Sequence, residues 1–148
     1  MTTILLDNIT HNHVDVIAKG LASAEQIFIC SAFLKTSGLD RLQTSLKTAL
    51  RNGASLKVIA GLDFYLTQPK ALWDLFDLVS QNKTPTASLI LCEENKASTF
   101  HPKLYCWLAG GVAGIVIGSA NMTGGGLGGG VSKNLELSVS IWCHANRH

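Results

Sequence analysis

Three pairs of polar residues, each pair two positions apart, could do chemistry in this chain. In extended backbone, residues i and i+2 point to the same face, so each pair would present two polar groups side by side. The set supplies an imidazole, an ammonium, a hydroxyl, amides and a carboxylate, which are the groups needed to bind and attack a phosphate. One such pair alone is usually a solvent-facing strand end, but three close together indicate a site. The pairs are His101 with Lys103, Ser119 with Asn121, and Asn134 with Glu136.

The elements that would position these pairs follow an α/β pattern. Residues 103–108, 114–117 and 135–142 are apolar and predict strands beside the three pairs. Upstream, helical spacing over 14–23, 39–50 and from 68 onward alternates with strand-like runs at 26–33, 56–61 and 88–92. This order predicts an α/β sandwich around a mixed sheet flanked by helices. Polar groups at the ends of buried strands are where such proteins place their sites.

Composition limits the classes of protein to which the chain can belong. Hydrophobic residues make up 47% of the 148 residues and charged residues 15%, which excludes disorder. A net charge of +2 is too small to indicate nucleic-acid binding by itself. No apolar run is long enough for a membrane span, and the start of the chain has no basic leader. We expect a cytoplasmic protein with one domain over residues 1–148, either complete or part of something longer.

The four cysteines, Cys30, Cys92, Cys106 and Cys143, are far apart in the sequence and each stands in an apolar run. Such positions favour buried free thiols over a disulfide framework.

The segments His101–Tyr105, Gly118–Gly124 and Asn134–Glu136 together resemble the signature of the phospholipase D superfamily. The H-x-K and G-S-x-N elements at this separation are specific, far more so than H-x-K alone. These motif segments are most similar to those of the nuclease branch, which includes metal-independent restriction endonucleases. The motifs cover about a quarter of the chain, and the α/β alternation before them suits the family fold.

One position departs from the family pattern. The usual motif has an aspartate five residues after the lysine, and Leu108 stands there instead. The restriction-endonuclease branch often lacks this aspartate, so the change favours that branch over lipases. The alternative is an inactive site.

The resemblance implies a mechanism that needs neither metal nor cofactor. One histidine attacks phosphorus and forms a phosphohistidine, and a second histidine protonates the leaving oxygen. His101 would take one of these roles, and Lys103, Asn121 and Ser119 would hold the nonbridging oxygens. Glu136 would orient the imidazole. Because the chain has one H-x-K motif and the mechanism uses two, we expect a symmetric homodimer that shares its site.

These observations favour a DNA endonuclease. A lipid or small-molecule phosphodiesterase with the same chemistry, and a noncatalytic nucleic-acid-binding module, are the alternatives. The absence of a membrane-seeking segment argues against the first alternative, and the complete set of polar groups argues against the second. The partners expected are therefore nucleic acid, with DNA favoured, and a second copy of the chain, without a membrane.

Other conspicuous residues have simpler interpretations. The segment 11–15 (HNHVD) reads as turn and capping residues before a helix, and His144 with His148 as exposed, rather than as metal sites. The glycine run Gly124–Gly130 predicts a mobile loop and not a dinucleotide site, because no strand-to-helix context surrounds it. Core packing is expected for Trp73, Trp107 and Trp142, and also for Tyr65, whose alternative is stacking on a base.

Overall fold

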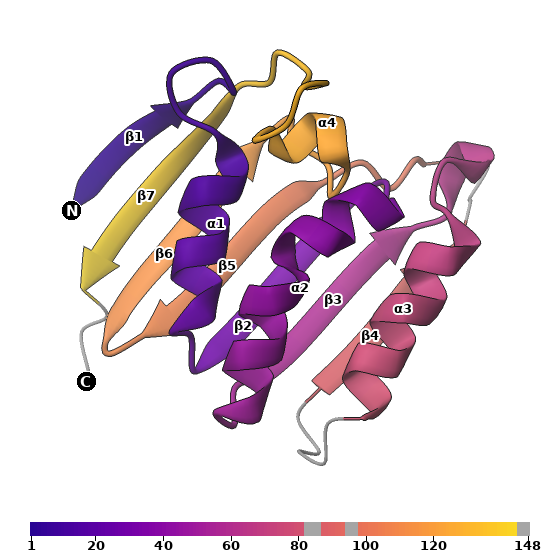
Figure 1. Ribbon diagram of the computed structural model, residues 1–148, viewed down its shortest axis with the longest axis horizontal. Coiled ribbons are helices and arrows are strands. Elements are labelled where there is room, and N and C mark those ends of the chain that lie inside the picture. The colour runs from indigo at the N-terminus through magenta and orange to yellow at the C-terminus, as the bar shows by residue number, and fades with distance from the viewer. Residues whose placement is uncertain (82–86, 94–97, 145–148) are drawn as a thin grey trace.

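The computed structural model describes residues 1–81, 87–93 and 98–144 (Figure 1). The strands are β1 (Thr2–Leu6), β2 (Gln26–Ser31), β3 (Ser55–Gly61), β4 (Ala87–Cys92), β5 (Lys103–Ala109), β6 (Val112–Gly118) and β7 (Ser138–His144). The helices are α1 (His13–Ala22), α2 (Thr36–Arg51), the 3₁₀ turn η1 (Asp63–Tyr65), α3 (Pro69–Ser80) and α4 (Gly124–Leu127).

The seven strands form one mixed sheet in the order β1-β7-β6-β5-β2-β3-β4. Strands β2, β3 and β4 are parallel to one another, as helical crossovers require, and the remaining pairs are antiparallel. The predicted α/β fold with a mixed sheet is therefore confirmed.

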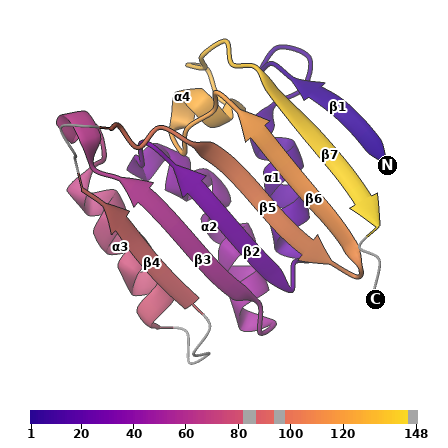
Figure 2. The ribbon, with the colours of Figure 1, turned by 180° about the vertical axis from the view of Figure 1, so that it is seen from behind.

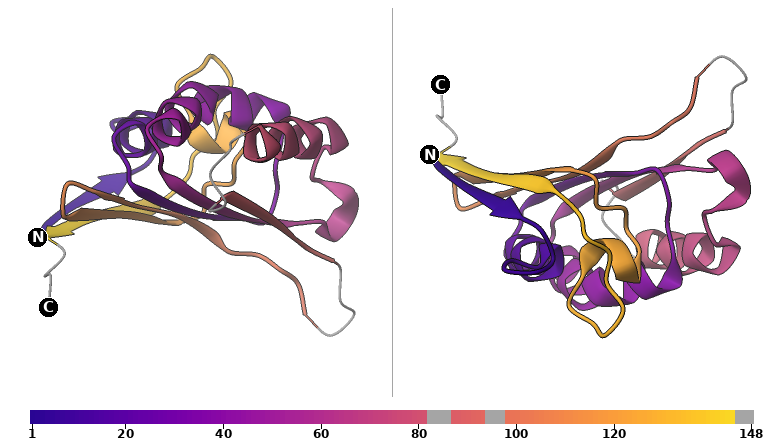
Figure 3. Two further views of the ribbon diagram at one scale, coloured as in Figure 1. Left: turned by 90° about the horizontal axis from the view of Figure 1, so that it is seen from below. Right: turned by 90° about the horizontal axis from the view of Figure 1, so that it is seen from above.

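Within the described part of the chain, the helices cover one face of the sheet. Figure 3 shows them as a single layer, and Figure 2 shows the sheet from the side that they leave open. The alternation of side chains along β5 follows this asymmetry. Tyr105 and Trp107 point to the helices and are buried, whereas Leu104, Cys106 and Leu108 point to the other face and are partly exposed.

Trp107 fills the space between the sheet and α1. A Cβ atom added at Gly20 of α1 would lie 2.1 Å from the Trp107 ring, and one added at Gly114 of β6 would lie 2.2 Å from it. Glycine at these two positions lets helix and sheet close onto the indole. The core prediction for Trp107 is correct, and Trp142 packs edge-to-face on it with ring centroids 5.0 Å apart.

The four cysteines are free and share the open face of the sheet. Strand register places Cys30, Cys92, Cys106 and Cys143 on the side opposite to Tyr105 and Trp107. Cys30 is buried and the other three are partly exposed, so the expectation of free thiols is correct and that of full burial holds for Cys30.

Several strands and helices begin or end at one edge of the sheet. It is called the upper edge from its place in Figure 1. Strands β2, β3 and β6 end there, and β5 and β7 begin there. Helices α1, α2 and α3 also begin at this edge, so their amino-terminal ends bring partial positive charge to it.

Three elements differ from the sequence expectations. Strand β1 was not expected, because five residues at the start of the chain show no clear alternation, yet the strand pairs with β7 along its length. Strand β7 begins at Ser138 and not at residue 135. The glycine run was expected to be a mobile loop, but Gly124–Leu127 forms the short helix α4, whose residues Gly124, Gly126 and Leu127 are buried.

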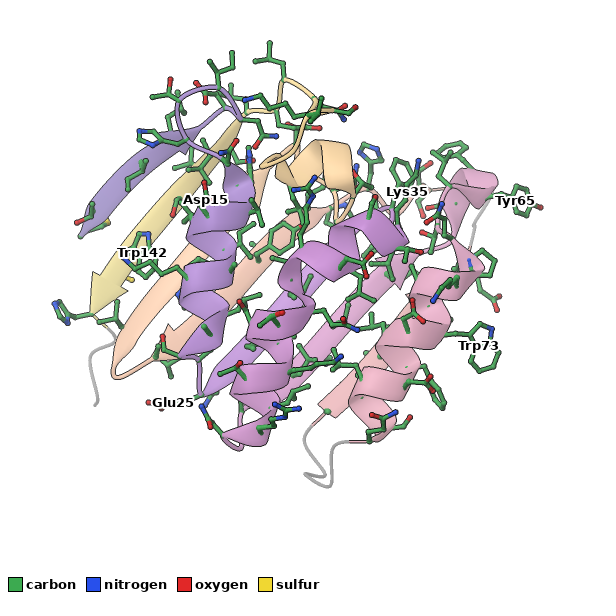
Figure 4. The ribbon with its side chains drawn as sticks, in the orientation of Figure 1. Asp15, Glu25, Lys35, Tyr65, Trp73 and Trp142 are labelled. Carbon is green, nitrogen blue, oxygen red and sulfur yellow. The ribbon has the colours of Figure 1, made fainter. Side chains whose placement is uncertain are left out.

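Two aromatic residues that were expected in the core lie at the surface. Trp73 is 66% exposed on α3 and Tyr65 is 93% exposed in η1, so the core prediction is wrong for both. Trp73 falls in a helical apolar period, but its side of α3 projects past strand β4 at the margin of the sheet (Figure 4).

No helix among the described residues is both long enough and apolar enough to cross a membrane.

Candidate active site at the upper edge

His101 and Lys103 meet at the start of β5. Lys103 Nζ lies 2.6 Å from Nδ1 and 3.0 Å from Nε2 of His101, and it donates to the His101 carbonyl oxygen at 2.8 Å. The two side chains therefore share one face, as the spacing predicted. His101 is exposed, so its ring can be approached from solvent.

The residue Lys103 is largely covered by protein. The residue is 8% exposed, on the helix-covered side of the sheet beside Tyr105. Burial lowers the pKa of the Lys103 ammonium, and the nearby charge of Glu136 partly offsets this by raising it. The Phe33 ring, which follows β2, lies beside both side chains. Its centroid is 6.0 Å from Lys103 Nζ and 5.6 Å from the His101 ring centroid.

Asn121 is fixed beside Phe33 by the segment that follows β6. Its Oδ1 accepts a hydrogen bond from the Phe33 amide at 3.1 Å, which turns the Asn121 amide group toward the residue that contacts His101. The Tyr105 hydroxyl donates to the Ala120 carbonyl at 3.1 Å, and Ser31 Oγ accepts from the Met122 amide at 2.9 Å. The two neighbours of Asn121 in the sequence are therefore fixed by hydrogen bonds, one to a side chain of β5 and the other to a side chain of β2.

Ser119, Asn134 and Glu136 form a second hydrogen-bonded set. Ser119 Oγ donates to one Glu136 carboxylate oxygen and accepts from the Leu137 amide at 2.9 Å. Asn134 Nδ2 donates to the other carboxylate oxygen at 3.1 Å. Glu136 thus bonds Ser119 and Asn134 within one chain, and among the described residues it makes no hydrogen bond to His101. The two sets lie at the same edge of neighbouring strands, because Ser119 follows the end of β6 and Lys103 begins β5, which pairs with β6.

A buried pair, His13 and the residue Asn8 that the sequence did not single out, supports the Glu136 segment. His13 and Asn8 are fully buried, and Asn8 Oδ1 accepts from the His13 amide at 3.1 Å and lies 2.7 Å from Nδ1. His13 Nε2 lies 2.7 Å from Ser138 Oγ, at the start of β7. The segment 11–15 was expected to provide turn and capping residues, but His13 instead joins α1 to the strand that follows Glu136.

Asn8 extends this support to the glycine run. Its amide nitrogen donates to the carbonyl oxygens of Gly126 at 2.8 Å and Asn134 at 3.2 Å, and its own backbone has a left-handed φ of 63°. Asparagine tolerates this conformation better than most residues. Asn8 and His13 together therefore fix residues 126, 134 and 138, of which Asn134 donates to the Glu136 carboxylate.

Leu108, which replaces the family's usual aspartate, is remote from these groups. It pairs with Gln26 at the opposite end of β5 and its side chain faces the open side of the sheet. The substitution therefore leaves the arrangement of His101 and Lys103 untouched.

Among residues 1–81, 87–93 and 98–144, no three or more His, Cys, Asp and Glu side chains gather as a metal site would require. His144 is exposed at the end of β7, and His148 lies outside the described residues.

Three solved structures share this fold at low sequence identity. NucT from Helicobacter pylori is 14% identical with a TM-score of 0.65, over 94% of this chain and 84% of that one. Nuc, a phospholipase D family member from Salmonella typhimurium, is 17% identical with a TM-score of 0.65, over 97% and 84%. Phosphatidylserine synthase from Haemophilus influenzae is 16% identical with a TM-score of 0.69, over 95% of this chain and 34% of that one.

No curated protein matches the sequence. The family described as the NgoFVII restriction endonuclease N-terminal PLD domain matches residues 7–146, which is nearly the whole chain and includes each of the three polar pairs. The chain therefore belongs to the phospholipase D superfamily, in the family of the NgoFVII restriction endonuclease N-terminal domain.

Proposed function

We propose that this chain is a metal-independent DNA endonuclease whose active site is completed by a second copy of the chain. The family to which it belongs is one of hydrolytic phosphodiesterases of the nuclease type. The observation that supports the finer proposal is the contact of the ammonium of Lys103, a residue that is 8% exposed, with the exposed imidazole of His101. A positive charge fixed beside a nucleophilic ring is what phosphoryl transfer requires.

In the proposed reaction, a ring nitrogen of His101 attacks phosphorus in line. A nitrogen–phosphorus bond forms as the bond to the leaving oxygen breaks, and His101 of the partner subunit donates a proton to that oxygen. Water then attacks the phosphohistidine, the partner's His101 takes back a proton, and free His101 returns with the phosphate monoester. No oxidant, reductant or metal enters this balance.

Lys103 and Asn121 would bind the nonbridging oxygens. The Lys103 ammonium has three N–H donors; contacts to the His101 ring and carbonyl oxygen leave one for a phosphate oxygen. Asn121 uses its Oδ1 on the Phe33 amide, so its NH₂ group is oriented as a neutral donor at the same edge. The amino-terminal ends of α1, α2 and α3 add positive potential there.

Glu136 would set the position of the glycine run and of Ser119, and in the dimer its carboxylate would be available to orient an imidazole. Asn134 would assist through its hydrogen bond to the same carboxylate.

The direct test is cleavage in the presence of a chelator. Purified protein is incubated with plasmid DNA, and separately with phosphatidylcholine vesicles, in excess EDTA, beside a His101→Ala variant. DNA cleavage that survives EDTA and is lost in the variant supports the proposal. Cleavage of the lipid alone, a requirement for metal, or equal activity of the variant contradicts it.

A further inference from the structure

The turn η1, at the end of β3, presents two aromatic rings to solvent. Phe64 is 56% exposed and Tyr65 is 93% exposed, and Figure 4 shows Tyr65 projecting away from the body of the molecule. Large aromatic side chains usually gain by burial, so two adjacent exposed rings call for an explanation.

The backbone that carries these rings is in an unfavourable conformation. Phe64 has φ 58° and Tyr65 has φ 55°, two consecutive left-handed residues of which neither is glycine. Bulky residues rarely adopt this region, and they persist there only where the surroundings hold them. Backbone strain of this kind concentrates at ligand-binding sites.

The surroundings fix the turn to the segment that carries His101. The Asp63 carboxylate is 1% exposed, and its Oδ2 accepts from the Phe100 amide at 2.7 Å, one residue before His101. On the other side of the turn, Thr67 Oγ1 accepts from the Leu34 amide at 3.2 Å and donates to the Gly61 carbonyl at 2.6 Å. The rings therefore have a defined position relative to His101.

That position is on the same edge as the site and close to it. Strand β3 is separated from β5 by β2 alone, which puts its end about 10 Å from the start of β5 at ordinary strand spacing. Phe33, at the end of β2, lies between the two and contacts the His101 ring edge-to-face. The upper edge thus carries aromatic rings both at the phosphate site and in η1.

We propose that Phe64 and Tyr65 form a binding subsite that stacks on an unpaired base of the nucleic-acid strand whose phosphate lies at His101. This rests on the proposed nuclease function and deepens it. The chain has a net charge of only +2, so long-range attraction contributes little to holding a polyanion. Stacking on exposed aromatic rings supplies affinity that does not depend on charge or on base identity.

The test compares binding of oligonucleotides with and without bases. Fluorescence anisotropy would measure the Kd of a single-stranded DNA oligonucleotide and of an abasic oligonucleotide of equal length. All proteins would carry His101→Ala, so that binding is measured without cleavage. The variants are Tyr65→Ala, Phe64→Ala and Tyr65→Phe, and Trp73→Ala is the matched control because Trp73 is an exposed aromatic on α3 that belongs to no part of the site.

Tyr65→Ala and Phe64→Ala should each raise Kd for the base-containing strand roughly 5- to 150-fold, the range for loss of one stacked base. The abasic strand should bind all variants alike, and Tyr65→Phe and Trp73→Ala should bind as the parent does. Unchanged Kd in both alanine variants, equal weakening by Trp73→Ala, or equal weakening toward the abasic strand would overturn the subsite. Failure of the EDTA cleavage assay would instead refute the nuclease proposal, since binding is scored separately.

Discussion

Lys103 is a buried residue whose positive charge the proposed reaction requires, although burial disfavours that charge. An ammonium is costly to bury, and burial accordingly lowers the pKa of Lys103 from its ordinary value. Its neighbours include an imidazole, a carbonyl and an aromatic face, all of which suit a cation. A charge held this way stabilises a developing phosphate charge without reorganisation.

Replacement of Lys103 by methionine should therefore lower kcat/KM on a phosphodiester roughly 10²- to 10³-fold, as loss of one positioned donor does in other enzymes. Methionine keeps most of the volume, so circular dichroism and the melting temperature should change little. Lys47→Met, at an exposed position on α2, is the control and should retain parental activity. A loss of less than threefold at Lys103 would remove it from the proposed mechanism.

His13 makes stability depend on pH. Burial lowers the pKa of His13, and the charges of Glu136 and Asp7 raise it by less. A histidine whose pKa is lower in the folded state favours folding in its neutral form. The contribution is present above the ordinary histidine value of about 6.5 and is lost as pH falls below it, by at most about 1.4 kcal/mol per pH unit.

Urea unfolding at pH 7.5 and pH 5.5 measures this dependence. The free energy of unfolding should fall more between these pH values in the parent than in His13→Gln, which should itself be less stable at pH 7.5. His11→Gln, at an exposed position, should retain the parental dependence. Identical pH dependence in the parent and His13→Gln would show that His13 does not titrate on unfolding.

At the scale of elements, α2 and the segment carrying Asn121 are packed in direct backbone contact. A Cβ atom added at Gly38 would lie 2.2 Å from the Met122 carbonyl, and the Lys35 amide donates to that carbonyl at 3.0 Å. The orientation of Asn121 therefore depends on a helix that contributes no side chain to the proposed chemistry.

Gly38→Ala should destabilise the protein by about 1–3 kcal/mol, the cost of an overpacked contact, and should also lower kcat as Asn121 moves. Thr44→Ala, on an exposed turn of the same helix, should change stability by no more than about 0.5 kcal/mol. The check is chemical denaturation together with steady-state kinetics. A stable and fully active Gly38→Ala would mean that the two segments adjust independently.

Sequence reasoning predicted the elements whose residues alternate or repeat clearly. Strands β2, β3 and β5 and helices α1, α2 and α3 were found within a few residues, and the H-x-K spacing correctly brought His101 and Lys103 together. Strand β1 was missed because its partner, β7, lies far along the chain, and only tertiary pairing makes it a strand. Two further features likewise depend on which elements become neighbours in the fold. One is the exposure of Trp73 and Tyr65, and the other is the contact of Asn8 with His13.

At the scale of the whole molecule, the proposed mechanism needs two imidazoles and one chain supplies one H-x-K motif. A symmetric pair with the site on its axis would bring two copies of His101 together. The exposed His101 ring at the upper edge is compatible with that arrangement.

Mixed dimers can test the sharing of the site. Parent and His101→Ala chains, mixed in equal amounts and allowed to exchange, should leave about half the activity of the same parent alone, because a mixed pair has one functional histidine. Mixing with an equal amount of His11→Ala chains, which keep His101, should instead give twice the activity of the parent alone. Full activity in the His101→Ala mixture, or a monomer in equilibrium sedimentation at the assay concentration, would contradict a shared site.

Because all four thiols lie on the open face of the sheet, their reaction rates can report how accessible that face is to solvent. Burial raises the pKa of the Cys30 and Cys106 thiols, so they have little thiolate to react near neutral pH. Alkylation with iodoacetamide should therefore reach Cys30, which is 7% exposed, last. Mass spectrometry of the labelled peptides over time would then read out, residue by residue, how far solvent reaches across strands β2 to β7.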